Sequence, residues 1–247
     1  MGASSEAFPI NATGPYIFRE AIPEQLYRVE ANTEYRLGAP GFEEVRVVAS
    51  PEQAAAALAF EAGDVDMVFN YPETDFERIQ ETGALGFTAP TARLYFYSMN
   101  TVSGPLAIPL IRQAVSLAID REGIVDAVLS GVGGVPAGTI YPANKGWAAD
   151  IPATYDPDRA EELLAEAGAV KTGGIWMLEG APLEIEILTY SSRAALPPTA
   201  EITQAFLQQI GVTAIVKVGE YGASNDAMLA GDGDMFLQAW EMLPQGD

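Results

Sequence analysis

EAGDVDMVF at residues 61–69 and LAGDGDMFL at residues 229–237 share the string Ala-Gly-Asp-x-Asp-Met, although they lie far apart in the chain. In both, a helix-forming segment reaches a glycine, and short acidic residues are followed by an apolar run. Glycine is favoured past a helix end because that position often has positive φ, and aspartate suits the turn because its carboxylate accepts bonds from backbone amides. We therefore predict two equivalent corners, each with a helix ending at glycine and a strand starting at the second aspartate.

The segments around these corners alternate between helix and strand signals. Periodic or alanine-rich runs between capping residues and glycines predict helices, and β-branched or aromatic runs predict strands. Helices are predicted at 50–63 with Ser50 as N-cap, at 72–83, on either side of 120–122, at 156–168 with Asp156 or Asp158 near the cap, at 198–211 and at 221–233. Strands are predicted at the end of 36–49 and at 64–70, 94–100, 182–190, 212–219 and 234–240. This order indicates an α/β protein, and 247 residues with 49% hydrophobic content suffice for one substantial core or two domains.

The chain contains neither cysteine nor histidine. It therefore forms no disulfide and offers no thiolate nucleophile, no imidazole base and no zinc site built from these residues. Ser-His-Asp and Cys-His hydrolysis are excluded within this chain. We predict no cofactor.

The net charge is −21, from 34 acidic and 13 basic residues. Such a surface repels nucleic acid and anionic lipid, so no nucleic-acid partner is expected. The acid excess indicates either a well-solvated surface, as in a salt-rich setting, or a cation site. No stretch has the apolar length of a membrane span, and residues 1–14 lack the basic and apolar regions of a secretory signal.

Seven dispersed motifs occur in an order that resembles family 5 of the solute-binding proteins that serve ABC importers, the dipeptide, oligopeptide and nickel class. They are GPYIF (14–18), GDVDMVF (63–69), RLYFYSMNT (93–101), IRQAVSLAIDREGIVDAV (111–128), YDPDRAEELLAEAG (155–168), PLEIEILTY (182–190) and GDGDMFLQAW (231–240). The resemblance spans roughly residues 11–247, and 180–212 resembles the nickel branch at least as much as the peptide branches.

This resemblance implies a type II periplasmic-binding-protein-like α/β fold, in which two lobes joined by a hinge trap a ligand. Family members are about twice this length, so we expect an incomplete portion: part of lobe one at 1–92 and much of lobe two at 93–247, C-terminally incomplete. The implied function is extracytoplasmic, in the periplasm or at the outer cell surface with or without a lipid anchor. It is capture of a peptide by lobe closure and delivery to a membrane permease, without catalysis.

Three candidate ligand residues lie on a strand and on a long loop. Tyr95 and Tyr97 alternate on a predicted strand, so one strand face presents two aromatic rings either to a solute or to the core. Trp147 lies in the glycine- and proline-rich segment 131–157, which is long enough to be a surface or binding loop.

The resemblance adds three more candidates. Arg193 lies in a loop where peptide-binding relatives hold the ligand carboxylate, for which a planar bidentate donor is suited; otherwise it is an exposed arginine. Trp240 ends a strand where relatives place a tryptophan near the ligand. Asp247 follows Gly246 where peptide-binding relatives show a Gly-Asp that meets the peptide amino group; otherwise it is a solvated acid. With a peptide cargo, Arg193 and Trp240 should face one cleft.

Two other classes of function remain open. A carboxylate-dependent hydrolase such as a glycosidase needs only aspartate and glutamate, but no motif marks one acid pair. Direct calcium binding is disfavoured because the repeated Asp-x-Asp strings lack a closing glutamate at loop spacing. Free nickel is hard to hold without imidazole or thiolate, so a nickel-type relative would bind a chelated complex. Peptide is thus the first cargo, chelated nickel the second, and another small polar solute such as a sugar the third.

Overall fold

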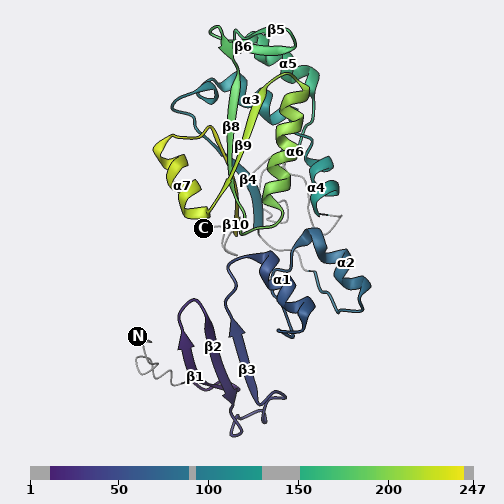
Figure 1. Cartoon of the computed structure of the whole chain (residues 1–247), viewed down its shortest axis with the longest axis vertical. Helices are drawn as coiled ribbons and strands as arrows, with labels where there is room; N and C mark the ends of the chain where they lie inside the picture. Colours follow the sequence, from purple (N-terminus) through teal and green to yellow (C-terminus); the bar gives the residue numbers. More distant parts are fainter. Residues whose placement is uncertain (1–11, 89–92, 130–150, 242–247) are drawn as a thin grey trace.

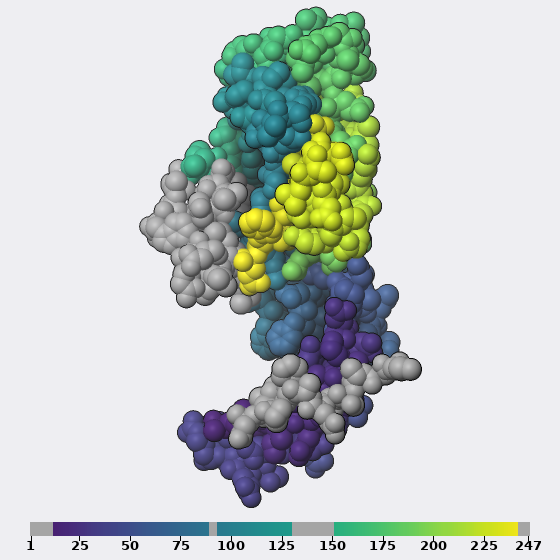
Figure 2. Space-filling model, turned by 90° about the vertical axis from the view of Figure 1, so that its left-hand side faces the viewer, coloured from purple at the N-terminus to yellow at the C-terminus, as the bar shows by residue number. Residues whose placement is uncertain are grey.

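The computed structural model describes residues 12–88, 93–129 and 151–241. These residues form two portions stacked along the long axis of the molecule (Figure 1). The first portion, residues 12–88, is drawn in purple and blue, and the second portion, residues 93–129 and 151–241, is larger (Figure 2). Among the helices of the described ranges, none combines the length and the hydropathy needed to cross a bilayer.

The first portion begins with an antiparallel meander of three strands. β1 (Tyr16–Ile22) pairs with β2 (Leu26–Ala31), which pairs with β3 (Glu44–Val48). None of the side chains in these strands is buried. The β-branched run of β3 was predicted from the sequence, and the strand confirms it.

Arginine and glutamate side chains form a network on this sheet. Arg28 Nη1 lies 2.8 Å from a carboxylate oxygen of Glu30 and 3.1 Å from one of Glu44. Hydrogen bonds from Arg19 and then Arg28 lower the pKa of Glu30, and those from Arg46 and then Arg28 lower the pKa of Glu44. The network therefore keeps both carboxylates ionised to a lower pH than an isolated glutamate.

Helices complete the first portion and correct two predictions. α1 (Gln53–Ala62) ends at Gly63, whose φ is 78°, as predicted. Its N-cap is Glu52 rather than Ser50, whose hydroxyl instead donates to the Glu52 carbonyl. A 3-10 turn η1 (Glu73–Asp75) leads into α2 (Phe76–Glu81), which confirms the predicted helix.

The predicted strand at 64–70 is wrong. This segment has no regular secondary structure, and Met67 and Phe69 are 68% and 80% exposed. A strand needs a neighbouring strand for its backbone hydrogen bonds. In the described part of the chain, the one sheet of the first portion is complete with β1, β2 and β3 and does not reach this segment.

The second portion is built on a four-stranded mixed sheet in the order β4-β10-β8-β9. The strands are β4 (Arg93–Met99), β8 (Glu184–Tyr190), β9 (Thr213–Gly219) and β10 (Met235–Glu241). β8 is parallel to β9 and β10, and β4 is antiparallel to β10. All four strands were predicted.

Two helices cover opposite faces of this sheet. On one face, Tyr97 of β4 contacts Thr203 of α6 (Leu196–Gln209). On the other, Phe236 of β10 packs against Tyr221 of α7 (Tyr221–Ala230). α7 ends at Gly231 with φ 85°, and β10 begins directly after Asp234, so the second predicted corner is confirmed.

The remaining helices pack around the core of the second portion. They are η2 (Pro105–Ala107), α3 (Pro109–Ala118), α4 (Arg121–Leu129) and α5 (Pro157–Glu166). The Asp156 carboxylate accepts a hydrogen bond from the Arg159 amide at 2.9 Å and caps α5, as predicted. The fully buried core side chains include Leu106, Ile111, Leu164, Ile185, Leu207 and Phe236.

A small antiparallel sheet was not predicted. It contains β5 (Val170–Thr172), β6 (Ile175–Leu178) and β7 (Ala181–Pro182). Gly173 and Gly174 both have positive φ, as a tight two-residue hairpin turn requires. The buried Trp176 donates its indole N–H to the Ile210 carbonyl at 2.8 Å, which fixes the hairpin to the end of α6.

Candidate functional site

The two portions meet at the carboxyl ends of the parallel strands. β8, β9 and β10 end at the side of the second portion that faces α1 (Figure 1). Ligands of open α/β sheets commonly bind outside the carboxyl ends of the strands, where loops rather than regular elements form the surface. The loop between β8 and α6, residues 191–195, lies at this edge and carries Arg193.

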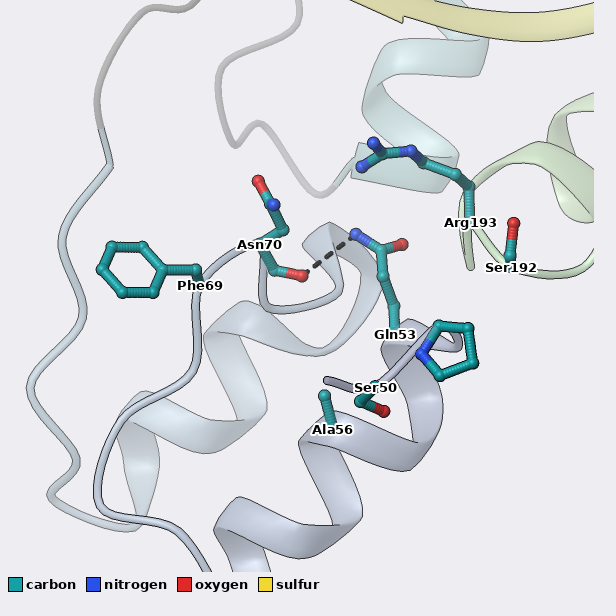
Figure 3. A pocket seen from close by; sticks show the side chains of 8 residues that line it. Ser50, Gln53, Ala56, Phe69, Asn70, Ser192 and Arg193 are labelled. Carbon is teal, nitrogen blue, oxygen red and sulfur yellow. Dashed lines mark hydrogen bonds between the residues drawn. The ribbon is translucent and has the colours of Figure 1, made fainter. Parts of the chain in front are cut away.

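A cavity of about 210 Å³ lies at this junction. The first portion lines it from the start of α1 and from the 69–70 bend, and the second portion lines it from the β8–α6 loop (Figure 3). The lining residues are Ser50, Pro51, Gln53, Ala56, Phe69, Asn70, Ser192 and Arg193. The cavity therefore needs both portions for its walls.

Gln53 joins the three segments that line this cavity. Its side-chain amide donates to the Asn70 carbonyl at 3.0 Å, and its side-chain oxygen accepts the Ala194 amide at 2.9 Å. Its backbone amide donates to the Ser192 carbonyl at 3.4 Å. Gln53 is 8% exposed, so these bonds are largely shielded from water.

Asn70 is held in a left-handed conformation with φ 58°, which asparagine tolerates better than most residues. Its carbonyl accepts from Gln53, and its side-chain oxygen accepts from Arg93 at 3.1 Å. Arg93 also lies 3.4 Å from a Glu241 carboxylate oxygen. The bend at Asn70 is thus tied both to α1 and to the first and last strands of the second portion.

Arg193 supplies the positive charge of the cavity. Its side chain extends from the β8–α6 loop above Gln53 and toward Asn70 (Figure 3). The structure shows no ion pair or hydrogen bond of its guanidinium group to any described residue. A half-buried guanidinium without a partner is suited to an anion, and its planar donor pattern matches a carboxylate.

Tyr95 lies close to this charge. Its hydroxyl donates to Glu73 Oε1 at 3.0 Å, which links β4 to η1 of the first portion. Burial first, and then the charge of Glu73, raise the pKa of Tyr95, while Arg193 and Arg93 act in the opposite direction. The tyrosine therefore stays protonated and serves as a hydrogen-bond donor at neutral pH. Its proposed contact with ligand remains a prediction.

Tyr97 and Trp240 lie apart from the cavity lining. The Tyr97 hydroxyl donates to the Thr203 hydroxyl at 2.7 Å, and burial raises its pKa. Trp240 is 56% exposed, stacks edge-on against Phe96 at 5.2 Å, and donates to the Gln238 side-chain oxygen at 2.8 Å. Both ligand roles remain predictions.

Trp240 is not among the residues that line the cavity with Arg193, and the expected shared cleft of the two stays a prediction. Trp240 pairs with Leu94 and Ala239 pairs with Tyr95, so the Trp240 and Tyr95 side chains occupy opposite faces of the sheet. The charge of Arg193 acts to lower the pKa of Tyr95, whose side chain lies on the same face as Tyr97 and α6. Trp147 and Asp247, the other predicted ligand residues, lie outside the described residues.

Sequence reasoning missed Gln53, Asn70 and Ser192. Asn70 precedes Tyr71-Pro72 and so carries a turn signal, because asparagine is enriched at positive φ. Gln53 carries none, since glutamine is an ordinary residue in a first helical turn. In the described ranges, no group of three or more acidic side chains is arranged to hold a metal ion.

The chain belongs to the bacterial extracellular solute-binding proteins, family 5: the profile of the middle portion of this family matches residues 3–244. It is 29% identical over 242 residues to the oligopeptide-binding protein AppA of Bacillus subtilis, covering 93% of this chain and 44% of that protein. It is 29% identical over 224 residues to the nickel-binding periplasmic protein of Escherichia coli, covering 86% of this chain and 42% of that protein.

Solved structures agree with this assignment. AppA of Bacillus subtilis in complex with a nonapeptide superimposes with a TM-score of 0.71 at 28% identity, over 92% of this chain and 46% of that one. NikA of Brucella suis in complex with Fe(III)-EDTA gives 0.76 at 27% identity, over 92% and 47%. The expected fold, a portion of a two-lobed periplasmic-binding-protein-like structure, is confirmed. The chain spans less than half the length of these relatives.

Proposed function

We propose that this chain is part of the extracytoplasmic solute-binding component of an ABC importer, and that its cargo is a peptide. The observation that carries the proposal is Arg193, whose guanidinium forms no ion pair or hydrogen bond within the described ranges and lies in a cavity whose walls come from both portions. A peptide carboxylate would supply the missing partner of this cation. Similarity to oligopeptide- and dipeptide-binding proteins supports the same cargo.

Binding in this proposal works by closure of two lobes, with the lobe boundary between residues 92 and 93. A cargo can favour the closed form only through contacts that exist in that form. The cavity provides such contacts because Gln53 and Asn70 belong to one side and Ser192 and Arg193 to the other. The closed protein then docks on a membrane permease and releases the cargo chemically unchanged.

The second candidate cargo is a chelated metal, because relatives include a nickel-binding periplasmic protein and a NikA bound to Fe(III)-EDTA. Free nickel would lack imidazole or thiolate ligands, since the chain has no histidine or cysteine. The carboxylates of a chelator could instead meet Arg193. Another small polar solute bearing an acidic group would fit the same cation.

The test compares Arg193→Ala with Arg46→Ala in the full-length protein. Arg46 lies on β3 with its side chain 66% exposed and does not line the cavity, so the control removes the same charge from outside the site. Loss of the charge-assisted pair from a partly desolvated site should cost roughly 2–5 kcal/mol of peptide binding. The dissociation constant should rise by about 30-fold or more, as measured by calorimetry, while the control stays near the wild type.

Equal affinity of both variants and the wild type for peptides would contradict the role of Arg193. A tight response to a nickel chelate, but to no peptide, would instead select the second cargo. Conversion of a bound peptide or glycoside into products, abolished by one Asp or Glu substitution, would overturn the proposal and favour a hydrolase. Each outcome is read from the same protein by calorimetry and mass spectrometry of the released ligand.

A further inference from the structure

We infer that Gln53 is a positioning residue for Arg193, through which the first portion sets the orientation of the cation that meets the cargo carboxylate. The inference rests on the proposed role of Arg193. Gln53 belongs to the first portion and carries no charge, so its function would be to orient the charged side chain of the second portion. The relevant contacts all flank Arg193 in the chain: Ser192 on one side and Ala194 on the other.

The loop has two attachments to Gln53. The Ser192 carbonyl accepts the backbone amide of Gln53, and the Ala194 amide donates to the side-chain oxygen of Gln53. Arg193 thus lies between two backbone groups that are both bonded to one residue of the other portion. Fixing the backbone on both sides of a side chain restricts the directions in which that side chain can extend.

The Gln53 side chain is itself held by a third bond. Its amide nitrogen donates to the Asn70 carbonyl, so the donor and the acceptor of the carboxamide are both in use. Glutamate would keep the acceptor for Ala194 but, when ionised, would lose the donor for Asn70. Leucine would keep the approximate size and lose both. Glutamine is therefore the side chain that satisfies both bonds at this position.

Helix geometry makes Gln53 available for this task. The first amides of an α-helix have no partner inside the helix, and Gln53 is the first residue of α1. Its amide is satisfied by the Ser192 carbonyl of the second portion. The contact between the two portions therefore satisfies the first amide of α1 and a carbonyl of the β8–α6 loop with a single hydrogen bond.

The test uses Gln53→Leu in the full-length protein, with Gln204→Leu as the matched control. Gln204 donates its side-chain amide to the Ala214 carbonyl at 2.7 Å, so the control also deletes a carboxamide bond to backbone, away from the cavity. Affinities are measured for trialanine and for its C-terminal amide, in wild-type and Arg193→Ala backgrounds. Hydrogen exchange of the 191–196 segment is measured without peptide, and Gln53→Glu is included because it keeps the acceptor for Ala194.

We expect Gln53→Leu to weaken trialanine binding by about 10-fold or more and binding of the amide by less than about threefold, because only the free acid uses Arg193. In the Arg193→Ala background, Gln53→Leu should weaken trialanine binding by less than about a further threefold, because the effects of residues that act through one interaction are not additive. Exchange in 191–196 should accelerate in Gln53→Leu and remain slow in Gln53→Glu and in Gln204→Leu.

Different results separate this inference from the proposed function. If Arg193→Ala weakens trialanine binding but Gln53→Leu does not, the positioning role is overturned and the proposed function stands. Equal losses for the acid and the amide, or full additivity with Arg193→Ala, overturn it as well, because a general structural role would act on both peptides. If wild-type protein binds no peptide acid, the proposed function fails and the inference fails with it.

Discussion

Replacing Tyr97 by phenylalanine tests whether this residue serves packing or cargo. The Tyr97 hydroxyl donates to the Thr203 hydroxyl at 2.7 Å, and Thr203 is fully buried. A typical intramolecular hydrogen bond contributes about 0.5–1.5 kcal/mol, and leaving a buried partner unsatisfied costs about 1–3 kcal/mol. Thr203 can recover part of this by bonding a carbonyl one helical turn earlier. We therefore expect Tyr97→Phe to lower the free energy of unfolding by about 1–2 kcal/mol.

A double-mutant cycle isolates this pair. Thr203→Val should also destabilise the protein, because it leaves the Tyr97 hydroxyl without its acceptor. The double variant replaces both polar groups, so its loss should be smaller than the sum of the two single losses by about 1 kcal/mol. Urea unfolding of the full-length protein, followed by circular dichroism, supplies the four free energies.

Cargo affinity supplies the second readout for Tyr97. If the residue only packs, peptide binding by Tyr97→Phe should stay within about twofold of the wild type. Additive single losses would mean that the hydrogen bond between Tyr97 and Thr203 is not made and would contradict the packing role. A tenfold loss of peptide affinity with unchanged stability would instead establish Tyr97 as a ligand residue.

Two further substitutions test the framework of the second portion. Trp176→Phe removes the buried indole donor to the Ile210 carbonyl and should lower the free energy of unfolding by about 1–3 kcal/mol in urea titrations, with peptide affinity unchanged; unchanged stability would contradict this. Asp234→Asn addresses a carboxyl group whose pKa is raised above 3.8, first by burial and also by Glu186 and Glu184. A raised folded-state pKa stabilises the fold at low pH, and this contribution is lost as pH rises through the folded pKa. The stability of Asp234→Asn relative to the wild type should therefore increase as pH rises from about 4, by less than about 1 kcal/mol, in thermal melts; a pH-independent difference would contradict the assignment.

Local sequence signals predicted most helices and strands of the second portion, because the local preference of each segment matches the element that the folded protein forms there. Asp156 was expected near a helix start and caps α5, and the glycine at 231 ends α7 in a left-handed conformation. The hairpin at Gly173-Gly174 was missed, although paired glycines between short β-forming runs are a known hairpin signal.

The segment 64–70 shows the limit of such signals. It shares an Asp-Met pair followed by apolar residues with the strand at 234–240, but an isolated run becomes a strand only where another strand lies beside it. Site residues are subject to the same limit. Arg193 was found through family resemblance, whereas Gln53 depends on partners at Asn70 and Ala194 that come together only in the folded chain.

The two portions are held together by different forces, because no side chain of the β1-β2-β3 sheet is buried. Its cohesion comes from backbone pairing and from surface arginine–glutamate contacts, which dissolved ions screen over roughly 8–10 Å. The four-stranded sheet instead rests on an apolar core that such ions leave largely untouched. Added salt should therefore destabilise the β1-β2-β3 sheet before the four-stranded sheet. Local opening of the β1-β2-β3 sheet should also cost less free energy than unfolding of the four-stranded sheet, whose β8 leads into the loop with Arg193.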